Sequence, residues 1–146
     1  MIKAIIIDDE ERARRVMRKL LEEFTEGVEV IAECANVPDA VRQINSLEPD
    51  VVFCDIEMPD FSGLELLSFF KEVNFELIFA TGYSEYAIQA FEMSAVDYLL
   101  KPIQIDKLEI AIERLKNKMQ QATMHDRLEA LKDNLKTDDL YKIALP

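Results

Sequence analysis

The sequence predicts an α/β domain in which five parallel strands alternate with five helices, and two observations carry this prediction. Short apolar runs of strand length recur five times along the chain, and longer amphipathic stretches separate them. Near-continuous runs of Val, Ile and Phe are typical of strands buried on both faces of a parallel sheet. Because crossovers between parallel strands are right-handed, this (βα)5 order predicts a doubly wound sheet with helices on both faces.

The predicted strands are the five apolar runs. The first is apolar apart from Lys3, and it ends abruptly in an acidic stretch over residues 8–11. In chain order, the strands are predicted over residues 2–7, 28–34, 51–54, 77–80 and 96–100.

The predicted helices are the stretches whose apolar side chains recur every three or four residues. The second has Pro38 in its first turn, where proline is favoured. The fourth, over residues 86–93, is shorter than the others. The apolar faces of the remaining four are Val16, Leu20, Leu21 and Phe24; Val37, Ala40, Val41, Ile44 and Leu47; Leu64, Leu67, Phe70 and Val73; and Leu108, Ile112, Leu115 and Met119.

The composition of the chain changes after Met119. Residues 120–123 are polar, and residues 125–136 form a charged helical stretch with Leu128, Leu131 and Leu135 on one side. Residues 140–145 are predicted to form a strand, and a single strand after a linker has no partner with which to pair. We therefore expect one domain over residues 1–119, a partly helical linker over residues 120–139, and the start of a truncated second domain at residues 140–146.

The composition of the 146 residues excludes several classes of function. The 29 acidic and 17 basic residues leave a net charge of −12, whereas phosphate backbones and anionic lipids both need a basic face. No apolar run approaches the roughly 20 residues of a membrane span, and the amino terminus has no signal-peptide pattern. The two cysteines, Cys34 and Cys54, cannot alone form a disulfide framework or a zinc site. We therefore expect a soluble cytoplasmic protein that touches neither DNA nor membrane through this stretch.

Acidic, hydroxyl and amino side chains follow four of the predicted strands. Asp8 and Asp9 follow the first strand, Asp55 the third, Thr81 the fourth and Lys101 the fifth. In a parallel α/β sheet, ligands bind outside the carboxyl ends of the strands. We therefore expect these side chains to meet at one edge of the sheet.

Three aspartates at that edge would gather like charges, which is unfavourable unless a cation neutralises them. Mg²⁺ is a hard cation that accepts a few carboxylates and recruits substrate phosphate. Aspartate is also a nucleophile that forms acyl phosphates. The edge is therefore suited to phosphoryl transfer, with Mg²⁺ and Lys101 neutralising the transferring group and the Thr81 hydroxyl donating a hydrogen bond to it.

Each of these residues also has a structural explanation when it is considered alone. Asp8 or Asp9 would cap the helix that follows, and Asp55 would open a turn. Thr81 would simply end a strand, and Lys101 would be a solvated charge. A site is favoured because four strand ends supply compatible chemistry at one edge, whereas residues without a joint role would scatter over both edges.

Short motifs at these positions resemble the receiver domain of bacterial two-component response regulators. They are Asp8-Asp9-Glu10, Asp55 with Glu57-Met58-Pro59 and Gly63, Thr81-Gly82, and Asp97-Tyr98-Leu99-Leu100-Lys101-Pro102. The resemblance covers residues 1–119. It implies a flavodoxin-like sheet with strand order 2-1-3-4-5, a phosphoacceptor switch rather than an enzyme, and a sensor histidine kinase as partner.

The resemblance implies roles for the residues that would carry the switch. Asp55 would be the phosphorylated residue, and Lys101 would pair with it afterwards. Thr81 and Tyr98 would be the switch pair, with Tyr98 turning inward and remodelling the surface of the fourth helix and fifth strand, which commonly dimerises in the family. The peptide bond before Pro102 would be cis.

The resemblance also implies a Mg²⁺ site. Asp9, Asp55 and the main-chain carbonyl of Glu57 would hold the ion, with Asp8 acting largely through water. One departure from the family is Gly82, where alanine is common, and this glycine would leave the phosphoryl pocket open.

Residues 84–91 and 95–102 resemble more narrowly the LytR/AlgR branch, whose members carry a C-terminal LytTR DNA-binding domain. Residues 141–146 are similar to the opening strand of such a domain. The branch implies a transcriptional regulator that forms a homodimer on phosphorylation and binds DNA only through a domain absent here. The last helix could then extend into a helical pair through Leu108, Ile112, Leu115, Met119 and Ala122, although packing on the sheet is the preferred interpretation of the first three.

Two other functions stay open. A haloacid-dehalogenase-like phosphatase also uses a strand-end aspartate and Mg²⁺, but it would need a second aspartate two positions after Asp55, where this chain has Glu57. A flavodoxin-like flavin carrier shares the order of elements, but the acidic residues 8–11 would repel its phosphate. Turnover of a small phosphoester would favour the phosphatase, and a coloured protein would favour the flavin carrier.

Overall fold

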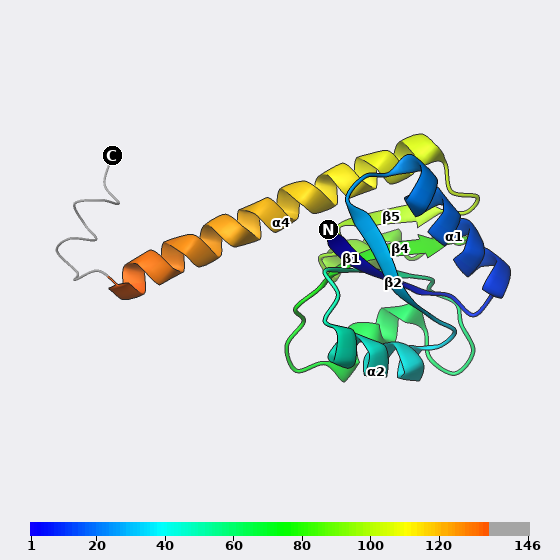
Figure 1. The fold of residues 1–146 in the computed structure, drawn as a ribbon. Helices are drawn as coiled ribbons and strands as arrows, with labels where there is room; N and C mark the ends of the chain where they lie inside the picture. The colour runs from blue at the N-terminus through cyan, green and yellow to red at the C-terminus, as the bar shows by residue number, and fades with distance from the viewer. Residues whose placement is uncertain (135–146) are drawn as a thin grey trace. The chain divides into compact units, whose positions relative to one another are not determined.

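The computed structural model describes residues 1–134 of the chain (Figure 1). The chain divides into two compact units, Met1–Arg114 and Leu115–Pro146. The first unit contains the sheet, and the described part of the second, residues 115–134, is helical. The strand predicted over residues 140–145 and the second domain predicted from residue 140 lie outside the described residues.

The strands form one parallel sheet in the order β2-β1-β3-β4-β5, which confirms the predicted doubly wound α/β fold. Ile7 pairs with Cys54 and Cys54 pairs with Phe79, so the carboxyl ends of β1, β3 and β4 lie close to one level. The strands are β1 (Ile2–Ile7), β2 (Val28–Cys34), β3 (Val51–Cys54), β4 (Glu76–Thr81) and β5 (Asp97–Leu100). Three of these bounds match the prediction, β4 is one residue longer at each end, and β5 begins one residue later.

The central strands are buried because helices cover both faces of the sheet. All four residues of β3 are buried. Side chains alternate between the two faces along a strand, so Ile5 and Ile7 join the core that includes residues of α2 (Val37–Leu47), whereas Ile6 lines a cavity beside α1 (Glu11–Phe24). Figure 1 shows these two helices on opposite sides of the sheet.

The third helical element, η1 (Gly63–Phe69), is a 3-10 helix that ends earlier than the predicted face. Its predicted apolar positions, from Leu64 to Val73, recur strictly every third residue. A spacing of three matches the three residues per turn of a 3-10 helix, whereas an α-helical face alternates spacings of three and four. Ser62 begins the helix with a capping box that includes Glu65.

The last two helices differ in how well their ends were predicted. α3 (Ala87–Glu92) lies within the predicted range of residues 86–93. α4 (Ile105–Asn134) instead runs without interruption through the polar residues 120–123. Glutamine and alanine are good helix formers, so the change in composition at Gln120 does not end the helix. Among the described residues, none of the helices combines the length and hydropathy that crossing a membrane requires.

Candidate functional site

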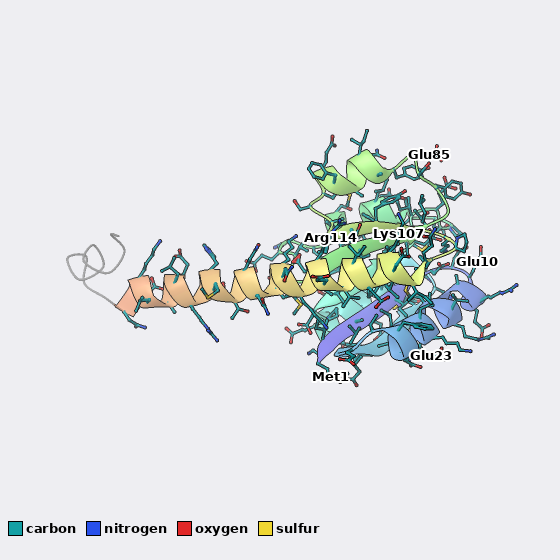
Figure 2. The ribbon with its side chains drawn as sticks, turned by 90° about the horizontal axis from the view of Figure 1, so that it is seen from above. Met1, Glu10, Glu23, Glu85, Lys107 and Arg114 are labelled. Carbon is teal, nitrogen blue, oxygen red and sulfur yellow. The ribbon has the colours of Figure 1, made fainter. Side chains whose placement is uncertain are left out.

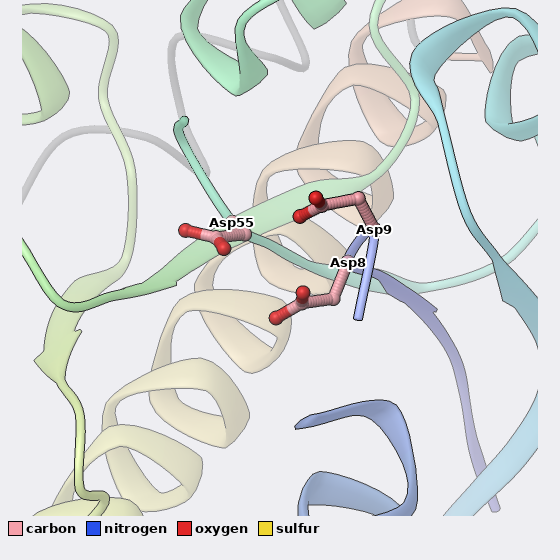
Figure 3. Close-up of side chains that lie close together, drawn as sticks. All are labelled: Asp8, Asp9 and Asp55. Atoms are coloured by element: carbon pink, nitrogen blue, oxygen red, sulfur yellow. The ribbon is translucent and has the colours of Figure 1, made fainter. Parts of the chain in front are cut away.

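Three carboxylates gather where β1 and β3 end (Figure 3). One oxygen atom from each of Asp8, Asp9 and Asp55 lies within 4.8 Å of the other two. Asp8 is 5% exposed and Asp55 is 8% exposed, whereas Asp9 lies in the open. In Figure 2, Glu10 and Glu85, which follow β1 and β4, lie at this end of the unit, and Met1 lies at the other.

The backbone brings Asp8 and Asp55 together because the strand pairing continues past the strand ends. The Asp55 amide donates to the carbonyl of Ile7 at 2.9 Å, and the Asp8 amide donates to the carbonyl of Cys34 at 3.0 Å. Adjacent parallel strands lie about 4.8 Å apart. Side chains on neighbouring strand ends are therefore held within contact distance by the sheet itself.

Lys101 is the cation of this cluster. Its Nζ donates to Oδ2 of Asp8 at 2.6 Å and to Oδ2 of Asp55 at 3.2 Å. Burial acts to lower the pKa of Lys101, but the hydrogen bonds and charges of the two aspartates outweigh it, so the pKa is raised. The peptide bond between Lys101 and Pro102 is cis, as the family resemblance implies.

In each buried aspartate, one carboxylate oxygen accepts a hydrogen bond from a backbone amide and the other accepts one from Lys101. Oδ1 of Asp8 accepts from the Glu10 amide at 3.0 Å, and Oδ1 of Asp55 accepts from the Ile56 amide at 2.7 Å. α1 has no side-chain cap hydrogen bond, so the capping explanation is wrong, and the bond of Asp8 is instead to the amide of Glu10, the N-cap residue. It does not compete with the cluster, because Oδ2 of each residue still faces Lys101.

Gly63 closes the loop after β3 directly against Asp55. Its amide donates to the carbonyl of Ile56 at 2.8 Å. A Cβ at this position would lie 2.0 Å from the main-chain oxygen of Asp55 and 2.9 Å from Sγ of Cys54. Gly82 is the opposite case, because a Cβ there would meet no atom within 4 Å.

The family of the chain follows from comparison with known proteins. The family model of the response regulator receiver domain matches residues 4–113. The chain belongs to this receiver domain family. The finding confirms the predicted family together with its strand order.

Curated relatives of this receiver domain are longer than the chain. A response regulatory protein of Vibrio cholerae is 40% identical over 146 residues, which cover 99% of this chain and 61% of that protein. A response regulatory protein of Yersinia pestis is 47% identical over 116 residues, covering 79% and 48%. The transcriptional regulatory protein BtsR of Escherichia coli is 40% identical over 136 residues, covering 90% and 56%. The chain thus spans about half the length of the relatives it matches.

Solved receiver domains share the fold. The receiver domain of AraT from Geobacillus stearothermophilus is 33% identical, with a TM-score of 0.73 over 84% of this chain and 98% of that one. The response regulatory domain of mrkE from Klebsiella pneumoniae is 26% identical, with a TM-score of 0.74 over 82% and 99%.

Thr81 of the receiver domain ends β4 and is fully buried. Within the described residues, its Oγ1 has no hydrogen-bond partner. A buried hydroxyl without a partner costs about 1–3 kcal/mol. Among the described residues, no hydrogen bond offsets this cost for the Thr81 hydroxyl.

Replacing Thr81 with valine is expected to leave the free energy of unfolding unchanged or to raise it by about 1 kcal/mol, because the isosteric side chain removes an unpaired hydroxyl. Thr25→Val is the matched control. The Thr25 hydroxyl donates to the carbonyl of Leu21 at 2.5 Å, so its loss is expected to lower that free energy by about 1 kcal/mol. Urea unfolding of both variants measures the difference. A loss at Thr81 as large as at Thr25 would contradict the assignment.

Tyr86 is a residue of the site that sequence reasoning missed. It is the N-cap residue of α3, and its hydroxyl donates to Oε1 of Glu57 at 2.6 Å. The hydrogen bond with Glu57 raises the pKa of Tyr86 to about 12, and the interaction of Tyr83 with the same carboxylate raises the pKa of Tyr83. The Glu57 carboxylate, two residues beyond Asp55, therefore links the loop after β3 to the loop after β4.

Tyr98 of β5 reaches the same loop. Its hydroxyl donates to the main-chain carbonyl of Tyr83, and its ring lies 6.3 Å from that of Phe79, between centroids. Burial raises the pKa of Tyr98. Tyr83 follows Thr81 by two residues, so the acceptor of Tyr98 lies on the same segment as Thr81.

Replacing Glu57 with glutamine is expected to lower the pKa of Tyr86 from about 12 towards the ordinary value of 10.0, because the carboxylate stabilises the protonated phenol. The bond between them is intact at neutral pH and is lost as the pH rises through the raised pKa. Ultraviolet absorbance of tyrosinate in a pH titration measures this change, and Tyr86→Phe identifies which transition belongs to Tyr86. Glu85→Gln, a weaker neighbour, is the control. Identical titration curves for Glu57→Gln and the unaltered protein would contradict the hydrogen bond.

Proposed function

We propose that Asp55 accepts a phosphoryl group from a sensor histidine kinase and that this receiver belongs to a transcription-regulating response regulator. The observation that carries the proposal is the setting of the Asp55 carboxylate at the end of the central strand. It lies beside Asp8 and Asp9, and Nζ of Lys101 is 3.2 Å from its Oδ2. A carboxylate there is a nucleophile whose product gains negative charge next to a fixed cation.

The transfer is a displacement at phosphorus. An oxygen of Asp55 forms a bond to phosphorus as the bond from phosphorus to the donor's imidazole nitrogen breaks, and the leaving imidazole takes up a proton. The Lys101 ammonium neutralises part of the charge on the phosphoryl oxygens. The chain acts as a phosphoacceptor switch rather than as an enzyme with turnover, because the group it receives stays on its own side chain.

The donor set at this edge suits Mg²⁺. Three carboxylates and one ammonium leave an excess of two negative charges, which one divalent cation would balance. Asp9, Asp55 and the main-chain carbonyl of Glu57 would hold the ion, with Asp8 acting largely through water, and all of these are oxygen donors of the kind Mg²⁺ prefers. When bound, it would supply charge neutralisation to the phosphoryl group.

Thr81 and Tyr98 are proposed as the switch pair. A phosphoryl oxygen on Asp55 would give the unused Thr81 hydroxyl the acceptor that it lacks within the described residues. Movement of Thr81 shifts the carbonyl of Tyr83, to which Tyr98 is hydrogen-bonded. The surface of α3 and β5 then changes, and two receivers associate there; Ile88 and Phe91 of α3 are 74% and 81% exposed, which supports an apolar interface.

A cavity beside the carboxylates supports docking of the kinase. It has a volume of about 320 Å³ and is lined by Asp8 and Lys101 together with apolar side chains of α1 such as Val16 and Leu20. The phosphoryl group must arrive at Asp55 from a histidine on another protein. An apolar recess next to the acceptor gives that protein a place to bind.

The output of the switch is proposed from the narrower resemblance. A receiver of the LytR/AlgR branch over residues 1–119, a linker over 120–139 and a LytTR domain from residue 140 would make a cytoplasmic regulator that binds DNA through the second domain. The relatives named BtsR are transcriptional regulatory proteins, and the net charge of −12 is consistent with DNA contact elsewhere.

Incubation with acetyl phosphate and Mg²⁺, followed by intact mass, tests the proposal. We expect one added phosphate, roughly 80 Da, because the carboxylate displaces acetate at phosphorus. Asp55→Asn is expected to abolish the addition, and Asp60→Asn, an exposed acid on the same loop, is expected to leave it intact. Addition to Asp55→Asn, or steady hydrolysis of a small phosphoester without a stable adduct, would refute the acceptor role.

A further inference from the structure

The last part of α4 lies beyond the residues that match the receiver family. The family match ends at residue 113, and the first compact unit ends at Arg114, yet α4 continues to Asn134. Every residue from 120 to 134 is exposed. An isolated helix of this length is marginal in water, because helix formation alone barely compensates the loss of chain entropy. Packing of an apolar face against a partner would therefore stabilise this part of the helix.

An apolar stripe on this part of the helix provides the contact surface. Met124, Leu128 and Leu131 are 66%, 48% and 39% exposed. Their spacing of four and then three is a heptad spacing, which places them on one face, and Leu135 continues it in the sequence. At about 100° per residue, the stripe residues lie roughly 100–200° around the helix from Leu108 and Ile112. Those two are buried, which agrees with the preferred prediction that they pack on the sheet, so the stripe is a separate face of the helix.

The charges of this segment favour a second copy of the same chain as the occupant. Residues 115–134 carry four cationic and three anionic side chains, whereas the whole chain has a net charge of −12. Receiver bodies of this chain repel one another at long range, but the helical segments do not. The cationic residues are Lys116, Lys118, Arg127 and Lys132, and the anionic ones are Asp126, Glu129 and Asp133.

We propose that two copies of this chain pair along the stripe of Met124, Leu128 and Leu131, forming a two-stranded coiled coil that does not depend on phosphorylation. The pairing is separate from the association of α3 and β5 surfaces proposed above, which requires phosphoryl transfer to Asp55. A helix pair of this kind holds two receivers at high local concentration, so that a weak contact between the receivers themselves becomes effective.

Cysteine cross-linking in the full 146-residue chain tests the pairing. Leu128→Cys places a thiol on the stripe, and Asp126→Cys places one on the opposite side of the same turn. The native thiols interfere little, because both are buried and burial raises the pKa of Cys34 to about 11 and also raises that of Cys54. In a glutathione redox buffer, we expect at least about ten times more disulfide-linked dimer from Leu128→Cys than from Asp126→Cys, as expected for a core position against an outer one.

The experiment is performed without phosphodonor and repeated in the Asp55→Asn background, so that its failure is distinguishable from failure of the acceptor proposal. We expect the same cross-linking in both backgrounds. Equal yields from the two cysteine positions would overturn the pairing. A second measurement is sedimentation velocity of the unaltered chain against Leu128→Lys: we expect concentration-dependent association that the lysine abolishes, and a monomer at every concentration in the unaltered chain would also overturn it.

Discussion

Replacing Gly63 with alanine is expected to lower the free energy of unfolding by about 3 kcal/mol or more, at the upper end of overpacking effects. The added Cβ would lie 2.0 Å from the main-chain oxygen of Asp55. That oxygen belongs to the backbone beside a buried strand, so it cannot turn aside as the end of a flexible side chain would. Either the loop after β3 is displaced or the end of the strand is.

Gly82→Ala is the matched control for this substitution. Its Cβ would enter open space, so we expect a change within about 0.5 kcal/mol, typical of exposed sites. Urea unfolding of both variants gives the comparison. If Gly63→Ala were as mild as Gly82→Ala, the close approach of the loop to Asp55 would be wrong.

Replacing Lys101 with methionine is expected to slow phosphoryl uptake from acetyl phosphate by about 100-fold or more, the usual effect of losing one preorganised charge-stabilising group. The same change is expected to strengthen Mg²⁺ binding, because it removes the ammonium that pairs with Asp8 and Asp55. Opposite effects on metal affinity and phosphoryl uptake distinguish loss of a charge from general misfolding.

The measurements for Lys101→Met are the rate of mass gain and a Mg²⁺ titration. Lys107→Met, an exposed lysine on α4, is the charge-matched control and is expected to change neither. Since the pKa of Lys101 is raised, its ammonium persists at neutral pH, and its contribution is lost only as the pH rises past the ordinary value of 10.5. An unchanged uptake rate in Lys101→Met would remove Lys101 from the mechanism.

The strands were predictable because a parallel sheet buried on both faces leaves a strong pattern in the sequence. β3 is four apolar residues followed by Asp55, and its predicted bounds are correct. The same topology predicted where the site lies, because the carboxyl ends of parallel strands share one edge of the sheet. Asp8, Asp55 and Lys101 were expected together, and their carboxylate and ammonium atoms are in hydrogen-bond contact.

Helix lengths were less predictable, for different reasons at η1 and α4. At η1, an apolar repeat of three residues was interpreted as an α-helical face, although that period belongs to a 3-10 helix. At α4, residues 120–139 were interpreted as a partly helical linker, and the helix is continuous through residue 134 because polar side chains such as Gln120 do not stop a helix that has no proline or glycine.

The contact between Tyr86 and Glu57 could not be predicted, because it depends on two irregular loops. Residues 55–62 and 82–86 carry no period that would indicate which side chains face each other. The signal available was only that Glu57 and Tyr86 both follow strands that end at the same edge. That placement restricts the candidates but does not select a pair.

The two edges of the sheet differ in how much they are packed, so a conformational change is expected to be larger at one edge than at the other. β2 and β5 are the two edge strands; β2 has seven residues and contacts α1 and α2, whereas β5 has four residues, of which only Leu99 is buried. α3, beside β5, has six residues and buries only Ala90. Segments with little buried apolar surface yield at low free energy. A conformational change that begins at the central strand therefore meets more resistance at the β2 edge than at the β5 edge. We expect the larger displacement at β5 and α3.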